Sequence, residues 1–258
     1  MKISIVTVSF NQARYLGEAM DSVLGQGYPE LEYIVVDPGS TDGSREMIAE
    51  RAGRLASTVL ERDRGAADGL NKGFARATGE IFGFLNADDV LYPGALKTVV
   101  AYFAQRPEID IAFGNGHVID EEGKRVRHVR AMNFSVAHCL YGGAMWLQQA
   151  TFFRAEAFRR SPGFNPENRT SWDGELLVQM AHAGARAGYI DADLAGFRIY
   201  ASSISGSGVL NAQYVRDRRR LFAEVKGRPW AKGDAVLGWL YRGSGYLKKL
   251  AYRAGGAR

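Results

Sequence analysis

Short apolar segments alternate with segments of helical periodicity along the first third of the chain. Strand-like runs occupy residues 2–10, 31–37, 56–60 and 81–85. Apolar residues with helical spacing separate them, at residues 15–24, 41–54 and 66–77. Repeated β-α units with short connections favour right-handed crossovers. The sequence therefore predicts an α/β fold with a mostly parallel central sheet flanked by helices.

The rest of the chain is less regular. Helical spacing recurs at residues 96–105 and 173–183, and again beyond residue 211 with a break at residues 227–229. The further strand-like segments are residues 109–113, 116–119, 149–153, 187–190 and 194–199. We expect one compact domain over residues 1–208, followed by a basic helical extension over residues 209–258.

Charge is unevenly distributed between these two parts. The chain carries a net charge of +5, but residues 209–258 hold 12 Lys or Arg against 3 Asp or Glu, a net charge of +9. The preceding residues are therefore mildly acidic. Attraction to an anionic surface is accordingly expected of the C-terminal extension.

Cysteine content and hydropathy indicate a cytoplasmic protein. The single Cys139 excludes an internal disulfide and a cysteine zinc site, as is usual in a reducing compartment. The sequence begins with a strand-like segment rather than a signal peptide, and it has no apolar run of about 18 residues. The four histidines show no metal-ligand spacing, so we expect no zinc site.

Polar clusters follow four of the predicted strands, at residues 9–11, 37–42, 63–68 and 86–89. Ligands of open α/β sheets bind beyond the carboxyl ends of the strands, so these clusters predict a nucleotide-binding crevice. Asp37 is a candidate acceptor for a base, and Arg64 is a candidate partner of phosphate. Asp88 and Asp89 have the oxygen ligands that a hard divalent cation prefers. The alternative is that these acids occupy solvated turns or cap helices.

The motifs in this order resemble the family 2 glycosyltransferases, which are inverting enzymes with the GT-A fold, a Rossmann-like α/β architecture. The resemblance rests on Ser9-Phe10-Asn11, on residues 35–44, and on Asn86-Ala87-Asp88-Asp89. Residues 63–73 also resemble a segment of bacterial members that build surface polysaccharides. The similarity covers about residues 1–205. It implies a donor half over residues 1–115 and an acceptor half over residues 116–208.

The resemblance also implies roles for individual residues. Asp37 contacts the nucleotide base, Arg64 and Asp68 line the donor pocket, and Asp88-Asp89 match the metal motif for Mn²⁺ or Mg²⁺. Asp89 is expected to be the direct metal ligand. The full set expected at the donor is Ser9, Asn11, Asp37, Arg64, Asp68, Asn86, Asp88 and Arg198.

An inverting transfer needs a general base to take the proton of the acceptor hydroxyl. By resemblance, Asp173 occupies the position of that base, although Trp172 stands where relatives usually have an acid. Glu175 is the alternative base. Acids in the first turn of a helix also favour the helix dipole without any catalytic role.

Two further positions belong to the expected site. Gln149 is a candidate for contact with sugar hydroxyls. Residues 197–205 resemble a stretch in which a histidine commonly follows Arg-x, and this chain has Tyr200 instead. Arg198 and Ser203 are candidates to compensate for that histidine.

The extension combines basic residues with Trp239, Leu240 and Tyr246. This composition suits a helix on an anionic membrane surface, which would place the chain beside a lipid-linked acceptor. The alternative is a tail that packs on its own domain with a solvated basic face. We expect no nucleic-acid partner, because no recognition motif accompanies the charge.

The sequence thus predicts a metal-dependent transfer of a sugar from a nucleotide-diphosphate donor, expected to be a UDP-sugar, to a glycan or lipid-linked saccharide of the cell surface. One alternative is a nucleotide-sugar-binding or scaffold protein with impaired catalysis, suggested by Trp172 and Tyr200. The other is a sugar-phosphate nucleotidyltransferase, although the Gly-rich loop after the first strand is missing.

Overall fold

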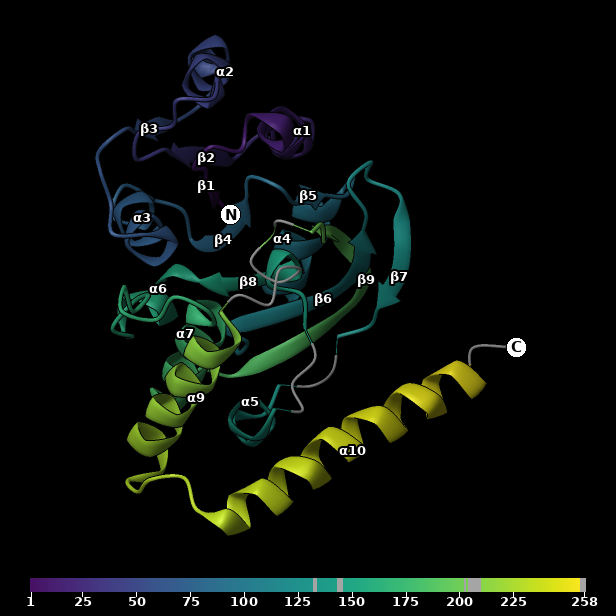
Figure 1. The fold of residues 1–258 in the computed structure, drawn as a ribbon. Coiled ribbons are helices and arrows are strands. Elements are labelled where there is room, and N and C mark those ends of the chain that lie inside the picture. Colours follow the sequence, from purple (N-terminus) through teal and green to yellow (C-terminus); the bar gives the residue numbers. More distant parts are fainter. Residues whose placement is uncertain (132–133, 143–145, 202, 204–209, 256–258) are drawn as a thin grey trace.

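A single nine-stranded sheet forms the centre of the molecule (Figure 1). The structure is a computed structural model that describes residues 1–131, 134–142, 146–201, 203 and 210–255, with the backbone alone for residues 211 and 244–255. The strand order is β3-β2-β1-β4-β8-β6-β9-β5, and β7 pairs with β6. The predicted α/β fold is confirmed.

The N-terminal part of the sheet is parallel, as predicted. It consists of β1 (Ile3–Val8), β2 (Leu31–Val36), β3 (Ser57–Val59) and β4 (Ile81–Asn86). The connecting helices are α1 (Ala13–Leu24), α2 (Ser44–Glu50) with the 3₁₀ turn η1 (Ala52–Arg54), and α3 (Ala66–Phe74). Each lies within a few residues of its predicted position.

The second part of the sheet is mixed. β8 (Thr151–Arg154), preceded by the 3₁₀ turn η2 (Gln148–Ala150), pairs antiparallel with both β4 and β6 (Ile111–Ile119). β9 (Ala187–Arg198) runs parallel to β6, and β5 (Val90–Leu91) and β7 (Arg125–Val129) pair antiparallel with β9 and β6. The strands predicted at residues 109–113 and 116–119 are therefore one strand, β6, and those predicted at residues 187–190 and 194–199 are one strand, β9.

Helices cover both faces of the sheet, because alternate strand residues point to opposite sides. Ile3 and Ile5 pack in one core with α1, α2 and α4 (Ala95–Gln105). Val6 packs in a second core with α3, α6 (Ala155–Arg159) and α7 (Trp172–His182). Strands buried on both faces read as continuous apolar runs, which is why the sequence identified them.

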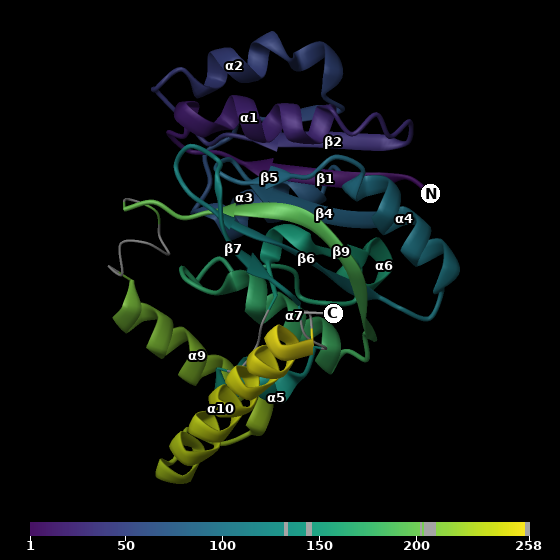
Figure 2. The ribbon, with the colours of Figure 1, turned by 90° about the vertical axis from the view of Figure 1, so that its right-hand side faces the viewer.

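The C-terminal helices pack on the second half of the domain. A third core joins α5 (Val136–Tyr141) and α7 to α9 (Asn211–Lys226) and to the start of α10 (Lys232–Gly255). Figure 2 shows α9 and α10 at the end of the molecule away from α1 and α2. The predicted boundary between residues 208 and 209 lies outside the described residues. None of the helices, over the residues that the structure describes, has the length and apolar character needed to cross a bilayer.

The carboxyl ends of four parallel strands are level with one another. Val8 pairs with Val36 and with Asn86, and Val36 pairs with Val59. The segments that follow these residues must therefore emerge at one edge of the sheet. This register brings the predicted polar clusters together.

Candidate active site

A cavity of about 910 Å³ opens at this edge of the sheet. Its walls come from all four strand-end segments, from the end of β9 and the residues after it, and from the segment that leads into α7. The residues that line it are Val8, Ser9, Phe10, Gln12, Pro38, Gly39, Arg62, Asp63, Arg64, Gly65, Ala66, Asn86, Ala87, Asp88, Arg169, Trp172, Phe197, Arg198, Tyr200 and Ser203.

The loops after β1 and β2 form one end of the site. Asp37 is fully buried and is not among the cavity-lining residues. Its Oδ1 accepts hydrogen bonds from the backbone N–H groups of Gly39 and Ser40 and from the guanidinium of Arg45. Its Oδ2 is buried without a hydrogen-bond partner, as is the Oγ of Ser9. Buried polar atoms are normally paired, so these two acceptors suit a ligand that brings its own donors.

Asn11 braces this end of the site and is not among the cavity-lining residues. Its backbone N–H donates to Ser40 Oγ at 2.8 Å, and its Oδ1 accepts from the backbone N–H of Thr41 at 3.0 Å. Its φ of 51° is in the left-handed region, which asparagine tolerates better than most residues. Asn11 therefore ties the β1 loop to the β2 loop.

The loop before α3 places both a negatively charged and a positively charged side chain on the cavity wall. Asp63 and Arg64 line the cavity, with Arg62 beside them. Asp68 does not line it: its carboxylate accepts from the backbone N–H of Arg64 at 3.0 Å. Asp68 thus holds the loop in shape. Burial raises the pKa of Asp63 above its ordinary value.

Gly65 is needed in this loop for its backbone conformation. Its φ is 116°, which side-chain-bearing residues rarely adopt, and a Cβ there would lie 2.8 Å from the guanidinium of Arg169. The glycine therefore lets the loop approach the Arg169 side chain closely.

The two adjacent acids after β4 have different surroundings. Asp88 lines the cavity, and its Oδ2 accepts from the hydroxyl of Tyr200 at 3.0 Å. Asp89 is fully buried beneath it, with Oδ1 accepting from the backbone N–H of Arg198 and Oδ2 from Gln149 and Asn86. Burial first, and then the charge of Asp88, raises the pKa of Asp89 well above its ordinary value. The metal role of Asp89 stays a prediction, and the geometry favours Asp88 as the direct ligand.

Asn86 and Gln149 complete the surroundings of Asp89. Asn86 lines the cavity and donates to both Asp89 and Gln148. Gln149 is 3% exposed and donates to Asp89 Oδ2 at 2.6 Å. Its amide is therefore engaged below the cavity, whereas the sequence suggested a contact with sugar hydroxyls.

Arg198 anchors the loop that carries the two acids. Its side chain is 1% exposed, and its Nε donates to the carbonyl of Asp88 at 2.8 Å. Its other nitrogens donate to the carbonyls of Asp120 and Glu121 and to Glu18 Oε2. Arg198 borders the cavity, but its guanidinium is already bound to protein groups.

Tyr200 occupies the position at which the similar stretch of relatives commonly has a histidine. Its hydroxyl contacts Asp88 and, at 3.2 Å, the side chain of Gln12. Burial, followed by the nearby Asp88 charge, raises the pKa of Tyr200 to about 12, so the hydroxyl keeps its proton at neutral pH. Tyr200 is therefore a neutral donor that orients Asp88.

Asp173 lies in the first turn of α7, next to the cavity residue Trp172. Burial raises the pKa of Asp173. Asp173 itself is not among the residues that line the cavity. The ring of Trp172 packs against Phe84 and Phe164, at centroid distances of 5.5 and 5.8 Å. The sequence placed Asp173 correctly at the start of a helix, and its catalytic role stays a prediction.

Glu175 is held in a buried ion pair. Its carboxylate, 4% exposed as a residue, accepts from both Nη atoms of Arg220 on α9 and from the amides of Asn165 and Asn168. Burial acts to raise the pKa of Glu175, but these hydrogen bonds outweigh it and hold the pKa below its ordinary value. Such an engaged carboxylate is a poor general base, which leaves Asp173 as the stronger candidate.

Several cavity residues were missed as site residues by sequence reasoning. Asp63 lies in a polar cluster at a strand end, and that position was the signal that could have identified it and its neighbour Arg62. Gln12 directly follows another such cluster and could have been found in the same way. Arg169 lies in the loop between α6 and α7, and no local sequence pattern indicates that this loop reaches the same edge of the sheet.

A different polar cluster lies on the second half of the sheet. His117, His128 and Asp193 each offer a ligand atom, and these atoms lie within 4.8 Å of one another. The sequence spacing of the histidines gave no sign of this group. Sequence spacing missed the group because it is assembled by pairing between three strands.

Comparison with known proteins agrees with the fold and the motifs. The model of glycosyl transferase family 2 matches residues 4–185. An uncharacterized glycosyltransferase of Nostoc sp. is 32% identical over 216 residues, which are 79% of this chain and 66% of the relative. The chain belongs to glycosyl transferase family 2. It spans less than two thirds of the length of the first curated relatives that it matches.

Two solved structures have the same fold. The S. aureus protein TarS, residues 1–349 in complex with UDP-GlcNAc, matches with a TM-score of 0.66 and 18% identity over 87% of this chain and 71% of that chain. The mannosyltransferase PcManGT from Pyrobaculum calidifontis, in complex with GDP-Man and Mn²⁺, matches with a TM-score of 0.66 and 20% identity over 100% of this chain and 76% of that chain. The chain thus has the GT-A fold.

The ion pair between Glu175 and Arg220 predicts a structural role for Glu175. We expect Glu175→Gln to lower the free energy of unfolding by about 2 kcal/mol. This loss is smaller than the loss on breaking a fully buried ion pair, because the Arg220 side chain is 34% exposed. A carboxyl with a lowered pKa stabilises only while ionised, so the loss should be full above its ordinary pKa of 4.5 and fade at lower pH. Urea unfolding at pH 7 and pH 4 measures both.

The matched control is Glu224→Gln, which removes the more exposed acid that pairs with the same Arg220. This change should cost less than about 0.5 kcal/mol. Equal losses in the two variants would show that burial of the Glu175 pair has no special importance.

Proposed function

We propose that this chain is an inverting glycosyltransferase that moves a hexose from a nucleotide-diphosphate donor, a UDP-sugar in our proposal, to a saccharide or lipid-linked acceptor of a cell-surface polysaccharide. The observation that carries the proposal is the convergence of three features in one cavity. These are the buried free acceptor of Ser9 on the cavity wall, with that of Asp37 directly before the wall residues Pro38 and Gly39; the cationic side chains around Asp63; and the carboxylate of Asp88.

The nucleotide occupies the end of the cavity between the β1 and β2 loops. Asp37 Oδ2 is a buried acceptor in need of a donor, and the ring N–H of uracil or guanine supplies one. Ser9 Oγ offers a second polar contact on the cavity wall. Uracil is the base in our proposal, as in the UDP-GlcNAc complex of TarS, and guanine is the alternative, as in the GDP-Man complex of PcManGT.

The diphosphate lies between the cationic wall and Asp88. Arg62, Arg64 and Arg169 all line the cavity, and guanidinium groups pair well with phosphate oxygens. Asp88 would hold a divalent cation, Mn²⁺ or Mg²⁺, since its carboxylate is the hard oxygen ligand that such ions share with phosphates. When bound, the cation stabilises negative charge on the departing diphosphate. Tyr200 fixes the orientation of Asp88 by donating to its Oδ2.

Asp173 takes the proton of the acceptor hydroxyl as the hydroxyl oxygen attacks the anomeric carbon. The attack comes from the face opposite the leaving diphosphate, so the configuration inverts. Burial raises the pKa of Asp173, which makes its carboxylate a stronger proton acceptor than an ordinary aspartate. Trp172, adjacent in sequence and lining the cavity, offers an aromatic face to the sugar.

A second candidate function is donor binding without transfer. The observation that favours it is that Asp173 is not among the residues that line the cavity, while Glu175 is committed to Arg220. A binding protein would retain the nucleotide contacts and lack a working base.

Replacement of Asp88 and of Asp173 separates these two functions. Asp88→Asn should abolish Mn²⁺-dependent release of UDP from UDP-sugars. Asp173→Asn should leave the donor Kd within about threefold but lower transfer by about 10²- to 10⁴-fold, the usual contribution of a general base. Isothermal titration measures donor binding, and UDP release with and without a pool of saccharide acceptors measures turnover.

Asp21→Asn serves as the control, because Asp21 pairs with Arg51 on the surface, away from the cavity. It should behave as the wild type in both assays. Donor binding by a wild-type protein that never releases UDP would favour the binding protein. Full Mn²⁺-dependent turnover by the Asp88 variant would contradict the proposed site.

We also propose that α10 rests on the anionic inner face of a membrane. Asp234, Gly238 and Tyr241 face α5, with Tyr141 donating to Asp234. On the other side of α10 the exposed apolar residues are Val236 (61%), Trp239 (69%) and Leu240 (51%). An apolar stripe on a basic helix suits an interfacial position beside a lipid-linked acceptor.

Vesicle binding tests this placement. The wild type should bind phosphatidylglycerol-containing vesicles and not neutral phosphatidylcholine vesicles. Trp239→Ser combined with Leu240→Ser should weaken binding at least tenfold, because the apolar anchor is lost. Val126→Ser, which removes a similarly exposed apolar residue on β7, is the control. Unchanged binding by the double variant would contradict the proposal.

A further inference from the structure

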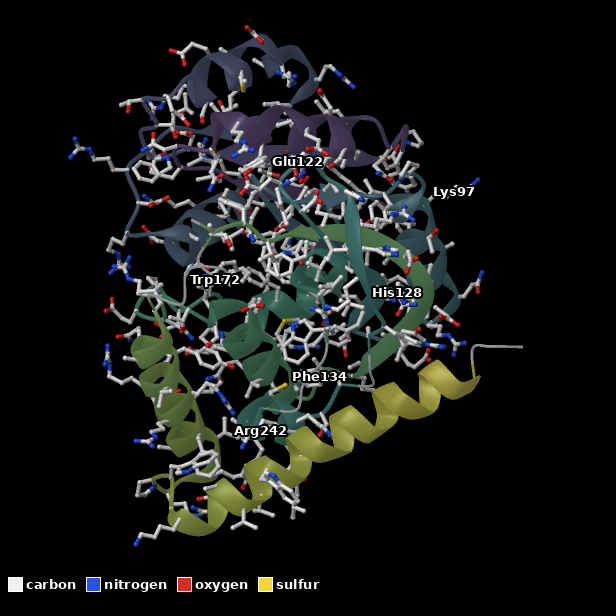
Figure 3. The ribbon with its side chains drawn as sticks, turned by 45° about the vertical axis from the view of Figure 1, so that its right-hand side comes forward. Lys97, Glu122, His128, Phe134, Trp172 and Arg242 are labelled. Atoms are coloured by element: carbon white, nitrogen blue, oxygen red, sulfur yellow. The ribbon has the colours of Figure 1, made fainter. Side chains whose placement is uncertain are left out.

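His117, His128 and Asp193 meet on the strands of the second half of the sheet, away from the cavity. His128 Nε2 lies 2.7 Å from Asp193 Oδ1, and His117 Nδ1 lies 3.9 Å from Asp193 Oδ2. The two imidazole rings are 4.9 Å apart between centroids. Figure 3 shows His128 well separated from Trp172, which lines the cavity.

Strand pairing builds this group. His117 on β6 is the direct partner of His128 on β7, so their side chains emerge on the same face of the sheet. On the other side of β6, Asp193 of β9 pairs with Asn115 at an irregularity in the register. Such irregularities re-aim side chains, and here Asp193 comes within reach of both rings.

The state of His117 suits a metal ligand. Its Nδ1 is buried and has no hydrogen-bond partner, although it lies close to the Asp193 carboxylate. A buried ring nitrogen that has no hydrogen-bond partner is available to bind an ion.

We propose that His117, His128 and Asp193 bind a divalent transition metal such as Zn²⁺, at a site distinct from the nucleotide cavity. Two imidazoles and one carboxylate are a donor set that Zn²⁺ accepts. Ligand atoms of a tetrahedral Zn²⁺ site are about 3.3 Å apart, as its bond lengths require. The present separations of at most 4.8 Å need only small side-chain rotations to reach that value. The side chains of His128 and Asp193 are 48% and 38% exposed, which leaves an entry path and an open fourth position.

Such an ion would cross-link three strands next to the donor loop. The ring of Tyr92 lies 5.8 Å from that of His117, and Tyr92 directly follows β5. β5 in turn directly follows Asp88-Asp89. Occupancy of the site is therefore expected to stabilise the segment that positions the acids of the cavity.

The test measures Zn²⁺ binding in the Asp88→Asn background, which removes the proposed cation ligand of the nucleotide cavity. After dialysis against ZnCl₂ and then metal-free buffer, the protein should retain one Zn²⁺ per chain by elemental analysis. The melting temperature should rise when Zn²⁺ is added, because an ion that binds the folded form stabilises it. His128→Gln and Asp193→Asn should each weaken binding at least tenfold.

His182→Gln is the matched control, since His182 is an exposed histidine on α7 outside the group. It should retain the ion. Metal-free melting temperatures identify any variant that is misfolded. The His128 and Asp193 side chains are both partly exposed, so each variant is expected to fold and gives an independent test of the site. Retention of Zn²⁺ by the His128 and Asp193 variants, or no retention by the parent, would show that His128 and Asp193 form only a hydrogen-bonded pair.

Discussion

The site depends on the buried carboxylate of Asp89. Its two oxygens accept from the backbone N–H of Arg198 and from the amides of Gln149 and Asn86, which come from three separate parts of the chain. A buried carboxylate without hydrogen-bond partners would strongly destabilise the fold, so the folded state requires these three donors to stay in contact with Asp89. One consequence is that the preceding residue, Asp88, is presented at the floor of the cavity. Arg198 reinforces this position by donating to the Asp88 carbonyl.

The extension is coupled to the same region through Glu175. The acid lies two residues after Asp173 on α7, and its partner Arg220 lies on α9. Thr170, just before α7, also donates to Asp217 of α9. The start of α7, which carries the proposed base, is therefore held by the C-terminal helices as well as by the sheet. This arrangement makes the extension part of the framework that positions the proposed base.

Much of the fold was predictable from sequence, for identifiable reasons. The parallel strands are buried on both faces, and their apolar runs end at polar clusters whose convergence follows from parallel topology. β7 was missed because Arg125, Val126 and Arg127 are exposed on an edge strand and carry no apolar alternation. β5 is only two residues long. Which of Asp88 and Asp89 faces the cavity was also beyond local pattern, because partners more than 50 residues away decide it.

The central claim is that Asp88, supported from below by Asp89, holds the cation that accompanies a nucleotide diphosphate. The anomalous scattering of Mn²⁺ in crystals grown with UDP locates this ion directly. The account predicts a peak in the cavity, at a metal–oxygen distance of about 2.0–2.6 Å from the Asp88 carboxylate. A peak bonded to Asp89 instead, or one outside the cavity with UDP bound inside it, would contradict the account.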